Sequence, residues 1–232
     1  MISNRTVPEL AAALQAADIP PRLAPTEAAL LLAVLRMVAT GRVVAPAQLS
    51  PLAASLAIPP DRLAPMLRQM AEYDEHGNII GMLGLSQAKH PHRFHCDGHP
   101  FTTWCAWDTL FLPILLQAPA QIETTCPATQ RTIRLTVTPD GVLSAEPAGA
   151  VLLIVVPPPA QQHITTVEQR WSRFCHHVWL FTTQEAAEQW PHDKPYDAVV
   201  LSLEDGFVLG RQVFADLLQS AQSAALPAAQ GG

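Results

Sequence analysis

Apolar positions in the first part of the chain recur at helical spacing. Between residues 26 and 40 they return every three or four residues, which predicts a helix that Thr26 can cap and Gly41 can end. Ser50-Pro51 predicts the cap and first turn of a second, short helix, and a third is expected from Asp61. The segment EYDEHGNIIGMLG then has the turn-plus-strand pattern of a hairpin.

Beyond residue 81 the pattern changes to short strands alternating with helices. Polar and apolar side chains alternate from Ile133 to Thr138, which predicts a half-buried strand, whereas the apolar run Val151–Val156 predicts a fully buried one. Capping patterns predict two late helices, one near Thr182-Thr183 and one at Ser202 that continues through Leu218. Two further strands are predicted at His177–Phe181 and Ala198–Leu203.

These elements predict an α+β protein with two parts. An N-terminal, winged-helix-like helical module is expected over residues 1–80. A mixed-sheet domain with flanking helices, expected to carry the chemistry, follows over residues 81–220. Residues 221–232 are small and polar and are expected to form a frayed tail.

A winged-helix-like module raises the question of DNA binding. Its helix in the recognition position carries Arg62 and Arg68, but Asp61 and Glu72 stand against them, and the whole chain has a net charge of -6. Neutralising nucleic-acid phosphates requires clustered Lys and Arg. We therefore interpret the module as a structural or docking element and expect no nucleic-acid partner, with direct DNA readout as the minority alternative.

The composition is that of a globular protein. Of its 232 residues, 49% are hydrophobic and 15% charged, and the 22 prolines are scattered between apolar runs. The N-terminus lacks a basic segment followed by an apolar core, so we expect no signal peptide. The longest apolar runs are too short to span a membrane, and we expect a cytoplasmic protein with no membrane partner.

The sequence contains four cysteines, and no two of them form a CxxC pair. An intracellular chain of this kind is not expected to have a disulfide framework, and the spacing argues against a zinc ribbon or a thioredoxin-like site. Any one of these cysteines taken alone is best interpreted as a small buried hydrophobic residue.

The segment PHRFHCDGHPFTTWCAWDTLFLPILL, residues 91–116, is the most informative. Cys105 and Asp108 are three residues apart, so a helix here would place thiol and carboxylate on one face. A thiol in a first helical turn gains thiolate character, and a carboxyl facing apolar side chains has a raised pKa, as a proton carrier requires. The CxxD pattern is weak alone, because a buried Cys and a capping Asp would also explain it.

Several ordered motifs resemble the organomercurial (alkylmercury) lyase family. TWCAWDTLFLP resembles the family's active-site segment, and EYDEHGNIIG resembles the hairpin before it. TTCPATQRTIRLTVTPDGV and AEPAGA are similar to the family's next segments, RFCHHVWLF to the stretch with the second reactive cysteine, and SLEDGFVLGRQ to the C-terminal helix. The resemblance covers most of residues 28–218, and motifs in this order are far more specific together than singly.

The resemblance implies a carbon–mercury lyase with three catalytic residues, Cys105, Asp108 and Cys175, which would also bind the mercury of substrate and product. Mercury is soft and prefers thiolates, so two cysteines can capture R–Hg⁺ while the aspartate moves a proton from a thiol to carbon. The resemblance also implies a structural role for Cys126 and none for Cys96.

Several features near these residues have simpler interpretations. His90, His92, His95, Cys96 and His99 could bind zinc, but the Asp-Gly turn among them should splay them, and we expect mostly exposed hairpin histidines. Trp104, Trp107 and Phe111 could line a substrate pocket or merely pack in the core. Family members often have paired cysteines at the second site, whereas His176 follows Cys175 here.

The implied partners are organomercurial small molecules, a mercuric reductase that accepts Hg(II), and small-molecule thiols that help remove product. No cofactor is expected, because protonolysis transfers no electrons. Two alternatives remain: a winged-helix, metal-responsive DNA-binding regulator with a cysteine metal site, and a metal-carrying protein without turnover.

Overall fold

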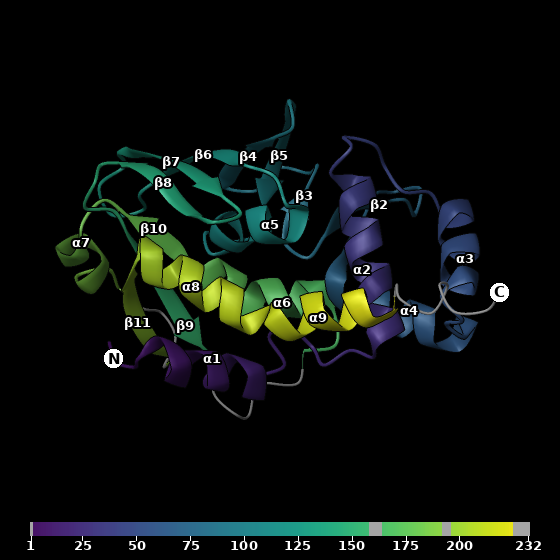
Figure 1. The fold of residues 1–232 in the computed structure, drawn as a ribbon. Helices are drawn as coiled ribbons and strands as arrows, with labels where there is room; N and C mark the ends of the chain where they lie inside the picture. The colour runs from purple at the N-terminus through teal and green to yellow at the C-terminus, as the bar shows by residue number, and fades with distance from the viewer. Residues whose placement is uncertain (1, 158–163, 192–195, 225–232) are drawn as a thin grey trace.

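The computed structural model describes residues 2–157, 164–191 and 196–224. They form an eight-stranded sheet and a three-stranded sheet with helices around them (Figure 1). The helical elements are α1 (Val7–Ala16), α2 (Pro25–Val38), α3 (Pro46–Ser55), α4 (Pro60–Met70), α5 (Asp108–Leu116), α6 (Val167–Arg173), the 3₁₀ turn η2 (Cys175–His177), α7 (Gln184–Glu188), α8 (Leu203–Val213) and α9 (Ala215–Ala224).

The large sheet has the strand order β1-β2-β3-β5-β4-β6-β7-β8, and the small sheet has the order β10-β9-β11. The large sheet consists of β1 (Ala71–Tyr73), β2 (Ile79–Met82), β3 (Leu85–Ser86), β4 (His92–Cys96), β5 (His99–Thr103), β6 (Ala120–Thr125), β7 (Thr132–Thr138) and β8 (Gly141–Glu146). The small sheet consists of β9 (Val151–Val156), β10 (Trp179–Phe181) and β11 (Asp197–Ser202).

The α+β class predicted from the sequence is confirmed, but the sheets are not mixed. Every pair of neighbouring strands that the structure describes in the two sheets is antiparallel. Within the large sheet, hairpins and other short connections join most consecutive strands, and such connections produce antiparallel neighbours. No helix in the described part of the chain is long and apolar enough to cross a membrane.

The N-terminal helices begin differently from the prediction. Helix α2 is confirmed, but its cap is not Thr26: the helix starts at Pro25, and Glu27 accepts the Ala24 N–H at 2.9 Å. Ser50-Pro51 does not start a helix either, because α3 begins four residues earlier at Pro46 and contains Pro51. Both helices place proline in the first turn, where no hydrogen bond to its nitrogen is needed.

The later elements follow the sequence pattern more closely. Strands β7, β9 and β11 confirm the predictions, and Ser202 caps α8 by accepting the Asp205 N–H. The strand predicted from His177 begins only at Trp179. The single helix predicted through Leu218 is two helices, α8 and α9. Helix α9 continues to Ala224, inside the predicted tail, and residues 225–232 lie outside the described residues.

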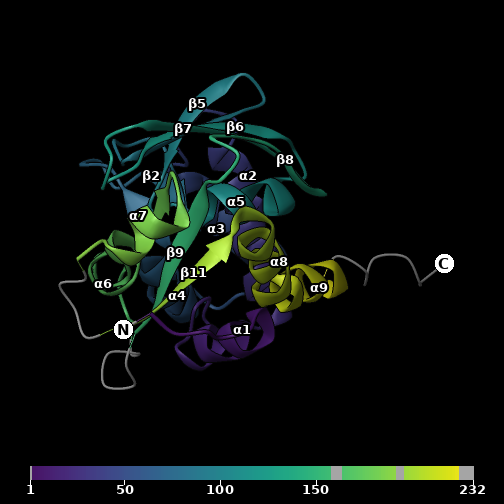
Figure 2. The ribbon, with the colours of Figure 1, turned by 90° about the vertical axis from the view of Figure 1, so that its left-hand side faces the viewer.

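Helix α5 lies between the large sheet and α8, as both ribbon views show (Figures 1 and 2). Two glycines of α8 permit this close packing. A Cβ on Gly206 would lie 2.8 Å from the Leu110 side chain, and one on Gly210 would lie 2.6 Å from the Cβ of Phe111. The indole N–H of Trp107 also donates to the Gly206 carbonyl at 3.0 Å. These contacts fix the start of α5, where the candidate site lies.

Candidate active site

Cys105 lies in the four-residue connection between β5 and α5. Helix α5 begins at Asp108, so the prediction that both residues belong to the helix is wrong for Cys105. The two groups are nevertheless adjacent, because the Asp108 carboxylate folds back and accepts the Cys105 N–H at 2.7 Å. Cys105 is fully buried and Asp108 is 5% exposed. Here the CxxD spacing forms a closed turn ahead of the helix.

Hydrogen bonds from several elements hold this turn. The Thr103 hydroxyl donates to the Cys105 carbonyl at 2.8 Å. The Trp104 N–H donates to the Gly84 carbonyl at 3.0 Å, and the Ala106 N–H donates to the Val178 carbonyl at 3.4 Å. The backbone that carries the thiol is thus tied to β5, to the connection before β3 and to the residue that precedes β10.

Gly84 is required by the position of Asp108. Its φ of +101° lies in the region that favours glycine, and a Cβ there would lie 2.6 Å from the Asp108 carboxyl carbon. No real Cβ makes a contact that short without displacing its neighbour. The carboxyl group therefore packs directly on glycine backbone.

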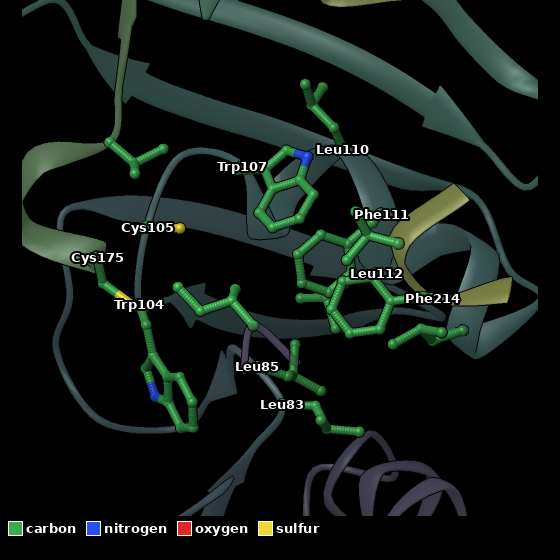
Figure 3. Close-up of a cluster of buried hydrophobic side chains, with 14 of the residues drawn as sticks. Leu83, Leu85, Trp104, Cys105, Trp107, Leu110, Phe111, Leu112, Cys175 and Phe214 are labelled. Atoms are coloured by element: carbon green, nitrogen blue, oxygen red, sulfur yellow. The ribbon is translucent and has the colours of Figure 1, made fainter. Parts of the chain in front are cut away.

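Cys175 reaches the same place from the other part of the chain. It follows the C-terminal end of α6 after Phe174 and opens η2, which leads into β10. Its side chain is 3% exposed and lies close enough to the Cys105 thiol to help raise the pKa of that thiol. Figure 3 shows both cysteines at one edge of a cluster of buried side chains, with the Trp107 and Phe214 rings beyond them. The structure thus brings together the three residues singled out in the sequence.

The buried surroundings change the acidity of two of these groups. Burial raises the pKa of the Cys105 thiol well above its ordinary value, and its hydrogen bond with Cys175 and the Asp108 charge act in the same direction. Burial also raises the pKa of Asp108 to about 7, against hydrogen bonds from Cys105 that favour the carboxylate. The raised pKa expected for Asp108 is confirmed. The thiolate character expected for Cys105 is not, because the thiol lies ahead of the helix and away from water.

A small cavity of about 30 Å³ opens beside these groups. Its wall is mainly aromatic and aliphatic, and Phe111 stacks on Phe214 with ring centroids 4.1 Å apart. Trp104, Trp107 and Phe111, which the sequence analysis considered as a pocket wall, all contact the cavity. The residues that give it chemical character are Asp108, Cys175 and Arg170.

Glu72 is a buried carboxylate that the sequence analysis did not recognise as part of the site. It accepts hydrogen bonds from the Ser86 hydroxyl at 2.6 Å and the Trp104 indole at 3.0 Å, and His90 Nε2 lies 3.1 Å away. Burial favours the neutral acid, but the hydrogen bonds from His90, Ser86 and Trp104 outweigh it and lower the Glu72 pKa. Glu72 thereby fixes the indole ring next to Cys105.

Arg170 is a second site residue missed at the sequence level. It lies on α6, is 5% exposed, and its Nε donates to the Gln69 carbonyl at 3.3 Å. The helical register of VEQRWSR places this arginine on the buried face of α6, but the short helix gives only a weak amphipathic signal.

The histidines divide into two groups. His95 and His99 are exposed, as expected. His92 is buried, contacts the Thr124 hydroxyl through Nδ1 at 2.7 Å, and has its pKa lowered to about 3 by burial and by the His90 charge. The expectation of exposed histidines is therefore wrong for His92, because it faces inward in β4, and for His90, which is half-buried beside Glu72. Among the described residues, no three His, Cys, Asp or Glu side chains are grouped to hold a metal ion.

The other two cysteines lie in separate places. Cys96 is 3% exposed in β4, and burial together with the Asp97 charge raises its pKa to about 11. Cys126 is fully buried at a turn, and Thr182 Oγ1 donates to its sulfur at 3.8 Å. Burial favours its thiol, but hydrogen bonds from Thr129 and Thr182 lower the pKa. The position of Cys126 agrees with a structural role.

Comparisons with known proteins assign the family. The family model described as alkylmercury lyase matches residues 85–215. The alkylmercury lyase of Streptomyces lividans is 42% identical over 63% of this chain and 64% of its own length. Those of Staphylococcus epidermidis and Pseudomonas putida are each 36% identical, over 77% and 84% of this chain and 78% and 87% of their own lengths.

A solved structure gives the same result for the fold. The mercury-bound form of MerB2 matches with a TM-score of 0.71 and 21% identity, over 90% of this chain and 99% of that one. The fold and the site together define the class of protein: an α+β enzyme with two buried thiols beside a carboxyl group. The chain belongs to the alkylmercury lyase family. The family resemblance expected from the sequence is confirmed, and a DNA-binding regulator is not favoured.

Proposed function

We propose that this protein is an organomercurial lyase that cleaves the carbon–mercury bond by protonolysis, with Cys105, Cys175 and Asp108 as its catalytic residues. The observation that carries the proposal is that buried Cys105 neighbours both Asp108 and Cys175, and that Asp108 and Cys175 line one small cavity. Family membership supports the same chemistry, since the named relatives are alkylmercury lyases.

The proposed reaction begins with capture of R–Hg⁺ by sulfur. The Cys105 and Cys175 thiols each lose a proton and bind mercury, which gives an adduct with one net negative charge. Asp108 takes up one of these protons, because its carboxylate lies against the Cys105 thiol. The other proton leaves with the ligand that the cysteines displace from mercury, for example as a free small-molecule thiol. A soft ion held by two thiolates leaves the carbon electron-rich and open to protonation.

Protonation of the carbon completes the proposed cycle. The Asp108 proton passes to carbon, the carbon–mercury bond breaks, and its electron pair forms the new C–H bond. The products are R–H, Hg(II) bound by two thiolates, and the Asp108 carboxylate. A carboxyl with a pKa of about 7 suits this step, because near neutral pH it can both accept and release a proton.

The surroundings of the cavity support this assignment. The Trp104 and Trp107 rings give an apolar wall that can receive an alkyl or aryl group and exclude water from the acid. Phe111 has a packing role as well, because its ring stacks on Phe214.

We further propose the partners of the reaction. External small-molecule thiols would remove Hg(II) from the two cysteines, and a mercuric reductase would accept it. No cofactor is needed in this scheme, because no electrons are transferred. A cytoplasmic location would keep the cysteines reduced, as capture requires.

For the N-terminal part we propose a structural role in a winged-helix-like arrangement. Helices α2, α3 and α4 are followed by the antiparallel pair β1 and β2, which is the order of elements in such a module. Arg62 supports the structural interpretation, because it pairs with Glu27 at 2.8 Å. Strand β2 crosses the division proposed at residue 80 and joins the module to the large sheet.

Benzene release tests the proposed function. Purified protein is incubated with phenylmercury and excess small-molecule thiol, and benzene is measured over many turnovers against heat-denatured protein. Catalytic release supports the lyase. Stoichiometric mercury binding without benzene would instead indicate a carrier, and salt-sensitive DNA binding without benzene would indicate a regulator.

A further inference from the structure

Arg170 is a buried cation beside the three proposed catalytic residues. Its side chain contacts the cavity that Asp108 and Cys175 also line. The residue is 5% exposed, and burial lowers its pKa, while the negative charges of Cys175, Asp108, Asp18 and Cys105, once ionised, raise it. Taking a guanidinium out of water is unfavourable unless other groups stabilise its charge.

The hydrogen bonds of Arg170 leave one nitrogen available. Nε donates to the Gln69 carbonyl at 3.3 Å, which orients the guanidinium group. Nη2 is buried and has no hydrogen-bond partner among the residues that the structure describes. No ion pair between Arg170 and a carboxylate occurs in the described part of the chain either. A residue that lines the cavity therefore carries a buried positive charge and an unused hydrogen-bond donor.

The proposed reaction produces one negative charge at this place. Two thiolates on R–Hg⁺ form an adduct with a net charge of −1. After proton transfer to carbon, the Hg(II) bis-thiolate is neutral and the negative charge resides on Asp108. The charge therefore moves from the mercury adduct to the carboxylate without leaving the cavity.

We propose that Arg170 stabilises this travelling negative charge, first on the mercury adduct of Cys105 and Cys175 and then on the Asp108 carboxylate. This inference rests on the proposed lyase function. A fixed cation that is already oriented before substrate arrives costs no reorganisation during the reaction. It also supplies an electrostatic partner for the Cys105 thiol, whose ionisation burial opposes, when the two cysteines bind a cationic substrate.

The test compares Arg170→Met, which keeps the length but removes the charge, with Arg170→Lys, which keeps the charge. Arg211→Met, at an exposed arginine of α8, is the matched control for loss of one positive charge. Benzene release and retention of phenylmercury after gel filtration are both measured on folded protein. We expect kcat/KM to fall about 100-fold in Arg170→Met, with less phenylmercury retained, and only about tenfold in Arg170→Lys. Arg211→Met should match the wild type.

Two outcomes would overturn the inference. One is a folded Arg170→Met variant with wild-type kcat/KM, and the other is equal losses in Arg170→Met and Arg170→Lys, which would indicate packing alone. If Arg170→Met does not fold, Arg170→Gln takes its place in the same comparison. Failure of the wild type to release benzene would instead refute the proposed function, so the two failures are distinguishable.

Discussion

The two cysteines of the site are held in contrasting ways. The Cys105 turn is closed by the Asp108 carboxylate and tied to distant parts of the chain through the Gly84 and Val178 carbonyls. The Cys175 turn has short-range backbone bonds: His177 donates to the Phe174 carbonyl at 2.9 Å, and Val178 donates to the Cys175 carbonyl at 3.2 Å. One thiol is fixed by tertiary structure, and the other is positioned by a single turn between α6 and β10.

This difference indicates that the two turns have different roles in binding mercury. The Cys105 turn also contains Asp108, and the Trp104 indole beside it is held by its hydrogen bond to Glu72. The geometry of this turn is therefore set before substrate arrives. The Cys175 turn has fewer backbone hydrogen bonds to distant elements, so moving it would break fewer of them. The Ala106–Val178 hydrogen bond links the two turns and keeps the sulfurs near each other.

The largest expected effect comes from removing either sulfur. Cys105→Ser and Cys175→Ser should each abolish benzene release, because a hydroxyl is a poor ligand for a soft ion. The two variants should differ in how much phenylmercury they still bind. Cys175→Ser should still bind one equivalent through the fixed thiol, whereas Cys105→Ser should bind more weakly. Mercury analysis after gel filtration measures this, and turnover by either variant would contradict the two-sulfur scheme.

Asp108→Asn should have the next largest effect. The amide can still accept the Cys105 N–H, so the turn is preserved, but it cannot deliver a proton. We expect kcat to fall by roughly 10²–10⁴, the usual contribution of a positioned acid, while phenylmercury retention stays near the wild-type level. Single-turnover benzene release separates the two steps. Rapid release by this variant would show that the proton reaches carbon by another route.

The same substitution should change how the free energy of unfolding depends on pH. The pKa of Asp108 is raised to about 7 in the folded chain, so the folded state keeps a proton that the unfolded state releases near pH 4. The Asp108 contribution to wild-type stability should therefore fall as pH rises from about 4 to 7, by at most about 1.4 kcal/mol for each pH unit, and level off above 7. Asp108→Asn should lack this slope. Urea unfolding of both proteins across this pH range gives the comparison.

Gly84→Ala should have an intermediate effect, because Gly84 packs against Asp108 in the Cys105 turn. Gly77→Ala is the matched control, because Gly77 also has a positive φ, of +78°, but no atom lies within 4 Å of its would-be Cβ. Both variants should lose about 1 kcal/mol of unfolding free energy from backbone strain. Only Gly84→Ala should also displace Asp108 and lower kcat, by about tenfold or more. Equal activity in the two variants would show that the Asp108 position tolerates movement.

The same contrast explains what the sequence could predict. Regular apolar patterns marked β7, β9 and β11, because burial of alternate or continuous side chains follows directly from position along a strand. The polar residues Thr26 and Ser50 do not mark the starts of α2 and α3, because proline begins both helices without a polar residue at the N-cap. The direction of the strands was not predictable, since it depends on which strands pair.

The sequence predicts the two turns of the site unequally. The Cys105–Asp108 pair was visible as a local motif, although not its turn geometry. No local pattern marks Cys175, which was found only through the family resemblance. The sequence does not reveal Glu72 or Arg170, because each belongs to the site only through contacts between distant segments. Glu72 accepts a hydrogen bond from Trp104, and Arg170 lines the cavity beside Asp108 and Cys175. A buried charged side chain in a short element carries little sequence signal.

The smallest effect is expected at a cysteine that belongs to neither turn. Cys96 is as buried as Cys175, yet its strand pairs it with His99 and Ala120, and its pKa is raised to about 11. Cys96→Ser should cost about 1–3 kcal/mol of unfolding free energy, because a hydroxyl replaces a buried thiol, and leave kcat for benzene release largely unchanged. Chemical denaturation and the benzene assay on the same preparation separate the two quantities. If activity were lost in Cys96→Ser while Cys105→Ser and Cys175→Ser retained it, burial of a thiol would not be enough to identify its role, and the assignment of the two turns would have to be abandoned.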